Sequence, residues 1–80
     1  MNFGALSVFP LGGNGTAVRL PDNSLFHFDT GEPVPDYHNR RERPPNQHDR
    51  KRFADEGFPA PMLARLLHPR NSQVLFPDAT

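Results

Sequence analysis

The chain has 80 residues, no cysteine, and nine cationic side chains against nine acidic ones. This length leaves room for one small domain, and the lack of cysteine excludes a disulfide framework, a thiolate zinc site and a cysteine nucleophile. Ten prolines and six glycines favour loops and short elements, whereas seven phenylalanines supply large apolar side chains for a core.

The first segment, MNFGALSVFPLGG, has no cationic side chain, and its apolar run is too short for a signal peptide. No segment of the chain approaches the roughly 20 apolar residues of a membrane-spanning helix. We therefore expect a cytoplasmic protein that does not enter a membrane.

Residues 1–29 predict a three-stranded antiparallel meander. Residues 3–9, 16–20 and 25–29 are rich in Val, Leu and Phe, and the last two runs alternate between apolar and polar positions. The segments between them contain Gly, Asn, Pro and Asp, which are typical of turns. The alternation predicts that Val18 and Leu20 lie opposite Arg19, and that Phe26 and Phe28 lie opposite His27.

Residues 30–45 show no periodicity and contain four prolines. Each proline breaks regular structure, and the residue before it favours extended geometry. We interpret this segment as a long, irregular, proline-rich arm that leaves the meander and crosses its surface.

Residues 46–57 predict a polar helix. Asn46 is a good N-cap with Asp49 three residues later, and Gly57 follows the helix where a positive φ is favoured. Phe53 and Phe58 are spaced so that they can touch across the end of the helix. Because Phe53 is its only strong anchor, most of this helix must face solvent or a partner.

Residues 58–80 predict a short apolar helix and a last strand. Met62, Leu63, Leu66 and Leu67 form one stripe that we expect to pack on the meander, and the alternative is a helix face offered to a partner. Residues 73–76 are expected to form the strand. The whole chain is thus predicted to be a small α+β domain with three or four antiparallel strands, one or two short helices and the irregular arm.

One basic stretch, residues 37–52, indicates a contact surface. It holds six of the nine cationic side chains and two of the four histidines, and it has no aliphatic residue. Arginine forks suit carboxylates and phosphates. The predicted partner-binding residues are Tyr37, His38, Arg40, Arg41, Arg43, His48, Arg50, Lys51 and Arg52.

Three interpretations of this basic stretch stay open. It can contact an acidic surface on another protein, it can bind nucleic acid with Tyr37, His38 and His48 stacking on unpaired bases, or it can be a solvated loop with internal salt bridges. Nucleic acid is less favoured because the net charge of the chain is zero and no RNP, KH or zinc-finger pattern is present.

The sequence offers little support for a metal site or a catalytic site. His38 and His48, with Asp36 or Asp49, offer nitrogen and oxygen ligands, but their ten-residue spacing matches no common metal motif. The serines lie in no G-x-S-x-G motif, and the glycine-rich residues 12–15 lack the ending of a phosphate-binding loop. We expect no enzymatic activity, no metal and no cofactor.

The sequence therefore predicts a non-enzymatic protein-binding domain that acts as an inhibitor or adaptor of a larger, acidic protein. Small phage-encoded inhibitors of host defence or transcription are one analogous class, by size and character alone. The alternatives are a nucleic-acid-binding accessory protein that uses the same arginines, and a structural protein that dimerises or assembles through Phe3, Leu6 or the last strand.

Overall fold

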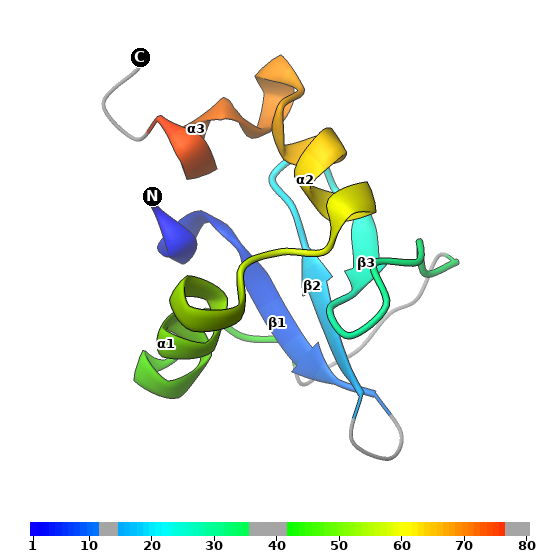
Figure 1. Cartoon of the computed structure of the whole chain (residues 1–80), viewed down its shortest axis with the longest axis vertical. Coiled ribbons are helices and arrows are strands. Elements are labelled where there is room, and N and C mark those ends of the chain that lie inside the picture. Colours follow the sequence, from blue (N-terminus) through cyan, green and yellow to red (C-terminus); the bar gives the residue numbers. More distant parts are fainter. Residues whose placement is uncertain (12–14, 36–41, 77–80) are drawn as a thin grey trace.

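The computed structural model describes residues 1–11, 15–35 and 42–76. In these ranges the chain forms a three-stranded antiparallel sheet and three α-helices (Figure 1). The small α+β architecture is thus confirmed. The elements in order are η1 (Phe3–Ala5), β1 (Ser7–Pro10), β2 (Thr16–Arg19), β3 (Leu25–His27), α1 (Gln47–Glu56), α2 (Ala60–Leu66), η2 (Pro69–Asn71) and α3 (Ser72–Leu75).

The sheet has the strand order β1-β2-β3, which confirms the predicted meander. Val8 pairs with Val18, and Val18 pairs with Phe26, so these three side chains share one face. Because side chains alternate along a strand, Phe9 and Ala17 belong to the opposite face. The first strand begins at Ser7 rather than at residue 3, since residues 3–5 form the single 3₁₀ turn η1.

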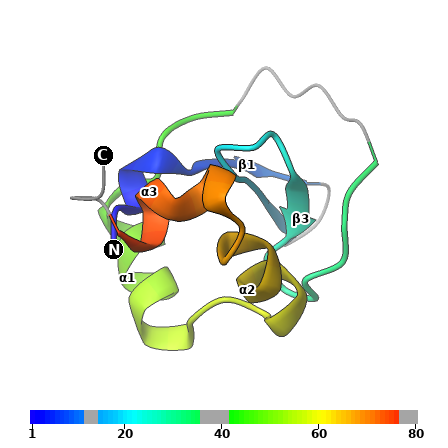
Figure 2. The ribbon, with the colours of Figure 1, turned by 90° about the horizontal axis from the view of Figure 1, so that it is seen from above.

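The helices cover one face of the sheet and close the main core over it (Figure 2). Phe28 after β3, Phe53 on α1 and Phe58 before α2 have ring centroids 5.2–6.1 Å apart. Edge-on and tilted ring packing of this kind adds to the free energy gained from burial. The buried members of this core are Leu6, Val8, Val18, Leu20, Phe26, Phe28, Phe53, Phe58, Met62, Leu66 and Val74.

A smaller core lies on the other face of the sheet. It contains Phe9, Ala17 and Leu25, with Leu11 and Val34 packed against it. Both faces of this short sheet are therefore apolar, which explains why strands as short as three or four residues carry few charged side chains.

Both edges of the sheet are occupied by the segments that flank residues 36–41. On the β1 edge, Val8 and Arg43 exchange two backbone hydrogen bonds of 2.8 and 2.9 Å. On the β3 edge, the His27 N–H donates to the Glu32 carbonyl and the Val34 N–H donates to the Leu25 carbonyl. The predicted arm thus starts and ends on opposite edges, and its course over residues 36–41 lies outside the described residues.

The polar helix α1 has the bounds predicted for it. The Asn46 side chain accepts a hydrogen bond from the Asp49 N–H, and the Asp49 carboxylate accepts one from the Asn46 N–H, which is a complete capping box. Gly57 ends the helix with φ 72° and ψ −175°. The predicted positive φ is confirmed, but the ψ lies in an extended region outside the left-handed helix.

The predicted last strand is wrong, because residues 72–75 form the one-turn helix α3. Val74 on this turn is fully buried, and the Asn2 N–H donates to its carbonyl. A fourth strand needs a free sheet edge, and the described residues 32–34 and 43 already occupy both edges. The apolar run Val-Leu-Phe therefore packs as a turn of helix, and the described chain has three α-helices rather than one or two.

The apolar helix α2 is confirmed, but only half of its stripe is buried. Met62 and Leu66 are fully buried, whereas Leu63 and Leu67 are 41% and 73% exposed. Successive residues of a helix are about 100° apart, so one core contact cannot cover all four side chains. In the part of the chain that the structure describes, none of the helices has the length and hydrophobicity needed to cross a membrane.

Candidate functional site

The helix α1 carries the second half of the predicted basic surface. Its capping box fixes where the helix starts, and Phe53, only 3% exposed, fixes which side faces the core. Helix periodicity then directs the side chains of His48, Arg50 and Lys51 away from the core, and all three are exposed.

Arg43 belongs to the framework rather than to a free surface. Its Nη1 atom donates to the Asp49 carboxylate at 2.6 Å and to the Pro44 carbonyl at 3.2 Å, while its backbone bridges to Val8. Burial alone would raise the pKa of Asp49, but the hydrogen bonds from Arg43 and the Asn46 N–H outweigh it and lower the pKa. This ion pair joins the β1 edge to the first turn of α1.

Arg52 is also a framework residue. It donates to Asp29 at 2.6 Å and to Glu56 at 2.8 Å, and its guanidinium lies over the Phe28 ring, 4.4 Å from the centroid. Burial alone would lower the pKa of Arg52, but the hydrogen bonds to Glu56 and Asp29 raise it. The side chain therefore ties α1 to the end of β3.

The structure sorts the predicted partner-binding residues into three groups. Tyr37, His38, Arg40 and Arg41 lie outside the described residues. Arg43 and Arg52 hold the fold together. His48, Arg50 and Lys51 point outward from α1, and neither Arg50 nor Lys51 forms an ion pair with any described residue.

This lack of partners distinguishes Arg50 and Lys51 from most other described cations. Arg50 and Arg70 are the two described arginines that have no described carboxylate within ion-pair distance. The other described arginines pair as Arg19–Glu42, Arg43–Asp49, Arg52–Asp29 and Glu56, and Arg65–Asp22. The unpaired cations are thus available to an external anion.

The helix surface around these cations is not uniformly basic. A shallow depression of about 440 Å³ is lined by three cationic or imidazole side chains and two acidic ones. Its residues are His48, Lys51, Arg52, Asp55 and Glu56. The acidic pair at the C-terminal end of α1 reduces the local positive charge, so the surface is better suited to a protein with matched charges than to a uniform polyanion.

A buried polar network, which the sequence did not reveal, joins the turn after β2 to α2 and η2. The Asp22 side chain, only 1% exposed, accepts from Arg65 at 2.8 Å and from the Ser24 N–H at 2.9 Å. The fully buried Asn71 accepts from the Asp22 N–H and donates to the Arg65 carbonyl, each at 2.9 Å. The sequence identified the turn, but its partners lie 43 and 49 residues away.

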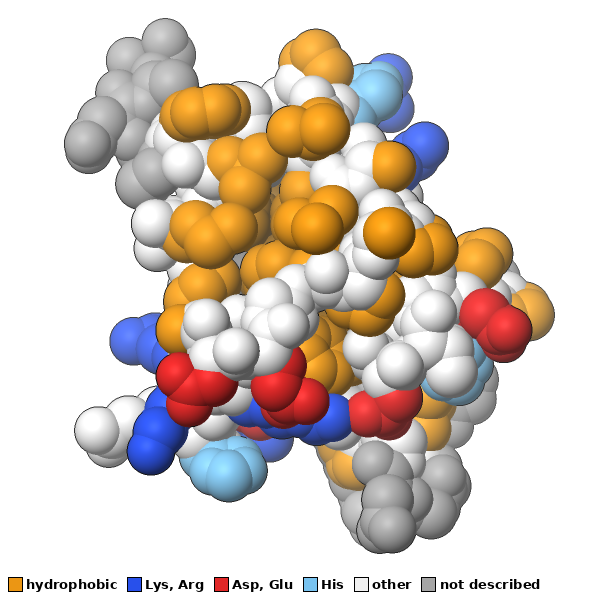
Figure 3. Space-filling model, in the orientation of Figure 1, with side chains coloured by type: hydrophobic (Ala, Val, Ile, Leu, Met, Phe, Trp, Pro, Cys, Tyr) orange, Lys and Arg blue, Asp and Glu red, His pale blue; other side chains and the backbone are white. Residues whose placement is uncertain are grey.

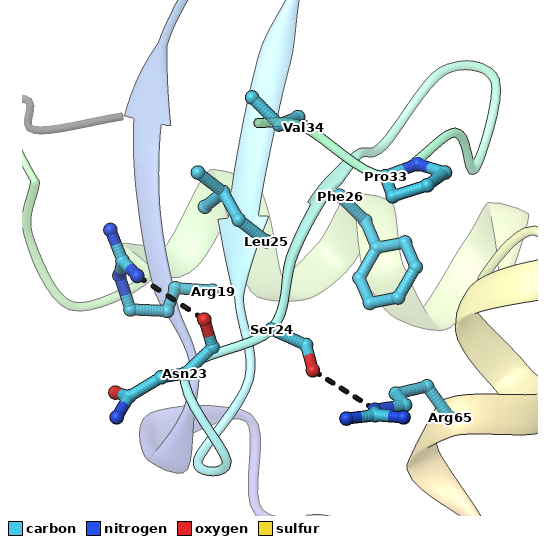
Figure 4. Close-up of a pocket in the computed structure, with 8 residues that line it drawn as sticks. All are labelled: Arg19, Asn23, Ser24, Leu25, Phe26, Pro33, Val34 and Arg65. Carbon is cyan, nitrogen blue, oxygen red and sulfur yellow. Dashed lines mark hydrogen bonds between the residues drawn. The ribbon is translucent and has the colours of Figure 1, made fainter. Parts of the chain in front are cut away.

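Beside this network lies an open pocket of about 470 Å³ next to the β3 edge. Leu25, Phe26, Pro33 and Val34 form its apolar lining, and Arg19 and Arg65 lie at its two sides (Figure 4). Each arginine already pairs with a carboxylate, which reduces the positive charge offered to a ligand. The pocket is consequently a weaker candidate than the unpaired cations of α1.

The described ranges were also compared with the ligand sets that hold metal ions in proteins. In them, no three His, Asp or Glu side chains come close enough together to hold a metal ion. No family model matches the chain, and neither the comparison with curated proteins nor that with solved structures produced a match. The surfaces described above therefore have to be interpreted from their own chemistry.

Proposed function

We propose that the protein is a non-enzymatic binding domain that acts as an inhibitor or adaptor of a larger protein. It contacts an acidic surface on that protein through the basic stretch, residues 37–52, which includes the outward side of α1. The observation that carries this proposal is how the cations are paired. Most described arginines have an ion-pair partner within the fold, whereas Arg50 and Lys51 on α1 are exposed and form no ion pair with a described residue.

Unpaired cations on a rigid helix suit a protein partner. The capping box and the Phe53 anchor hold α1 in place, so binding orders only the outer side chains. Charges at the rim of an interface raise the association rate and select partners of opposite charge. The proposal revises the predicted contact set. Arg43 and Arg52 now support the fold, and the residues that remain in the set are Tyr37, His38, Arg40, Arg41, His48, Arg50 and Lys51.

A charge-reversal experiment tests the proposal. The tagged protein and its Arg50→Glu/Lys51→Glu variant are used to capture partners from the native cell extract, with and without nuclease. We expect a stoichiometric protein that survives nuclease and is lost in the double variant. Because both side chains are exposed and unpaired, the Tm of the variant should stay within about 2 °C of the parent value.

Two further variants distinguish loss of a specific contact from a general effect of charge reversal or of destabilisation. Arg70→Glu reverses an equally unpaired arginine on another element and should retain the partner that α1 binds. Arg52→Ala should lower the free energy of unfolding by about 1 kcal/mol, because it removes the contacts to Asp29, Glu56 and Phe28. Retention of the same protein by the double variant would refute the role of α1.

The second candidate is nucleic-acid binding by the same cations. It predicts that retention disappears with nuclease and that affinity for any long polyanion falls steeply with salt, through release of counterions. The acidic side chains Asp55 and Glu56 beside Lys51 argue against it. Self-association, the third interpretation, has less support: of the features expected to mediate it, Leu6 is 2% exposed, residues 72–75 are helical, and Phe3 is partly buried in the main core.

A further inference from the structure

Two surfaces outside α1 have chemistry that the proposed function does not use. Hydrophobic side chains gather over α2, α3 and the N-terminal segment, with both acidic and basic side chains at the borders of this face (Figure 3). Because charges of both signs border the face, its chemistry selects no particular partner. The pocket beside the β3 edge has a more specific lining.

The side of this pocket that faces the helices has an apolar surface. Phe26 on β3 and Pro33 form an isolated antiparallel bridge, and the backbone hydrogen bonds lie on either side of this pair. Phe26 and Pro33 are therefore a non-hydrogen-bonded pair, in which the two side chains lie close together on one face. Figure 4 shows Pro33, the Phe26 ring and Arg65 of α2 along the same side of the pocket.

Arg65 is held in place by one nitrogen atom and has two others to offer. Its Nε atom donates to the Asp22 carboxylate at 2.8 Å and to the Ser24 Oγ atom at 2.9 Å. Its two Nη groups form no hydrogen bond with a described residue, and the side chain is 49% exposed. The contacts of Nε thus orient the guanidinium while the Nη groups stay accessible. Two parallel N–H groups of this kind match the two oxygens of a carboxylate.

The charged side chains that line the pocket are both positive. They are Arg19 and Arg65, and no acidic side chain belongs to the lining. Their ion-pair partners, Glu42 and Asp22, are not lining residues, and the Asp22 side chain is only 1% exposed. Glu32 is not a lining residue either, since neighbouring residues of an extended segment point to opposite sides. The ion pairs nevertheless reduce the net charge, so a monoanion suits the pocket better than a dianion.

We propose that this pocket is a binding site for a carboxylate that is attached to an aromatic group. The Nη groups of Arg65 hold the carboxylate, and the surface of Phe26 and Pro33 covers the aromatic group. The ring of Phe26 favours an aromatic ligand, because two rings gain free energy from offset or edge-on packing. The pocket volume of about 470 Å³ lies within the range of about 300–1,000 Å³ that is typical of small-molecule sites.

Three small probes of matched structure test the two halves of the site. N-acetylphenylalanine carries both groups, its amide lacks the negative charge, and N-acetylalanine lacks the ring. We expect N-acetylphenylalanine to shift the amide signals of residues 24–26, 34 and 65 in NMR spectra. It should bind at least about tenfold more tightly than either analogue. An analogue that binds as tightly as the acid, or shifts confined to other residues, would overturn the proposal.

A matched pair of variants at Pro33 tests the charge of the pocket. The pair with Phe26 uses no backbone hydrogen bond, so replacing Pro33 removes none. Pro33→Glu and Pro33→Gln have side chains of the same size and differ in charge. N-acetylphenylalanine should bind at least about fivefold more weakly to Pro33→Glu than to Pro33→Gln, whereas its amide should bind both equally. Equal binding of the acid to both variants would contradict the proposal.

Arg65→Lys tests the guanidinium itself. Lysine keeps a positive charge beside Asp22 but does not present two parallel N–H groups. The affinity for N-acetylphenylalanine should fall at least about fivefold, while the NMR spectrum of the free variant shows a retained fold. The control Arg50→Glu/Lys51→Glu changes α1 and should leave the affinity unchanged, so the pocket is tested independently of the function proposed above. Unchanged affinity in Arg65→Lys would exclude the fork as the carboxylate holder.

A free aromatic acid and the C-terminus of a peptide that ends in phenylalanine present the same chemistry. A tetrapeptide ending in phenylalanine distinguishes these two sources. Tighter binding of the tetrapeptide than of N-acetylphenylalanine identifies a peptide terminus as the ligand, and equal or weaker binding identifies a small acid; either result supports the site. Phenyl phosphate, which is mostly a dianion at neutral pH, should bind more weakly than phenylacetate. Tighter binding of phenyl phosphate would assign the pocket to phosphates and overturn the proposal.

Discussion

The Asp22 carboxylate belongs to a turn, yet it is almost completely shielded from solvent. Burial alone would raise its pKa, but hydrogen bonds from Ser24, Asn71 and Arg65 outweigh that effect and lower the pKa to about 2 from 3.8. A buried charge is tolerated only when donors replace its hydration, and here those donors come from three separate segments. The network holds the turn after β2 against the end of α2 and η2.

Asp22 should make the stability of the protein depend on pH. A carboxyl group whose pKa is lower in the folded state stabilises the fold fully above the unfolded pKa, and this contribution is lost as the pH falls from about 4 to about 2. The loss should be about 2 kcal/mol for this group. We expect urea unfolding of the Asp22→Asn variant to show a flatter pH dependence in this window than the parent protein.

The comparison with the parent protein isolates Asp22 from other groups. Asp49, whose pKa is also lowered, titrates in both proteins, so its contribution cancels. Parallel curves for the two proteins between pH 4 and pH 2 would show that the Asp22 network does not contribute to this dependence.

At the scale of elements, the connections decide how the helices meet the sheet. Gly31, in the turn after β3, is buried and has φ 76°. A Cβ atom at this position would lie 2.6 Å from the Cβ of Pro59 and 3.1 Å from the Cδ of Pro61. The turn therefore packs directly on the segment that leads into α2, and only glycine permits both its conformation and this approach.

Gly31→Ala should consequently destabilise the fold. We expect a loss of more than about 2 kcal/mol, because backbone strain and the clash with Pro59 act together. The control Gly4→Ala should change the free energy of unfolding by less than about 0.5 kcal/mol, since Gly4 is exposed and its φ is not positive. The measurement is urea unfolding of each variant.

The contact with Pro59 can be checked separately. Combining Gly31→Ala with Pro59→Gly removes the opposing Cβ atom, so the double variant should lose less than the sum of the two single changes. If the losses of the two single variants simply add in the double variant, the effect of Gly31→Ala comes from backbone strain and not from the contact with Pro59.

The sequence predicted the helices and strands better than it predicted the side-chain contacts between them. The capping box of Asn46 and Asp49 was predictable because its atoms lie within four residues. The alternation around Arg19 and His27 correctly assigned their neighbours Val18, Phe26 and Phe28 to the core. In contrast, the sequence showed six cations in one basic stretch, and could not show that Arg43 and Arg52 pair with carboxylates inside the fold.

At the scale of the whole molecule, four phenylalanine rings join elements from both halves of the chain. Phe3 packs edge-on against Phe53 and Phe58, with ring centroids 5.6 and 6.0 Å apart, and these two rings also contact Phe28. One aromatic cluster therefore links η1, the end of β3, α1 and the segment before α2. A domain of this size has few such contacts to lose.

Truncation of the central ring should disrupt the whole fold at once. Phe53→Ala should cost about 3–5 kcal/mol, which is comparable to the total stability of a small domain, so the far-UV CD signal of α1 and the near-UV signal of the rings should be lost together. Phe76→Ala is the control. Because Phe76 is 60% exposed, its truncation should cost less than about 1 kcal/mol. Loss of α1 with an intact sheet would show that the two parts fold separately.

The sequence by itself determined the meander, the capped helix α1 and the apolar helix α2, since alternation, caps and helical spacing act over a few residues. Only the tertiary structure decided three other features: that residues 72–75 form a helix, that Arg43 and Arg52 support the fold, and that Leu63 and Leu67 remain exposed. Each depends on which distant segment occupies a sheet edge, neutralises a charge or covers a helix face. Contacts of that range leave no periodic signal in the sequence.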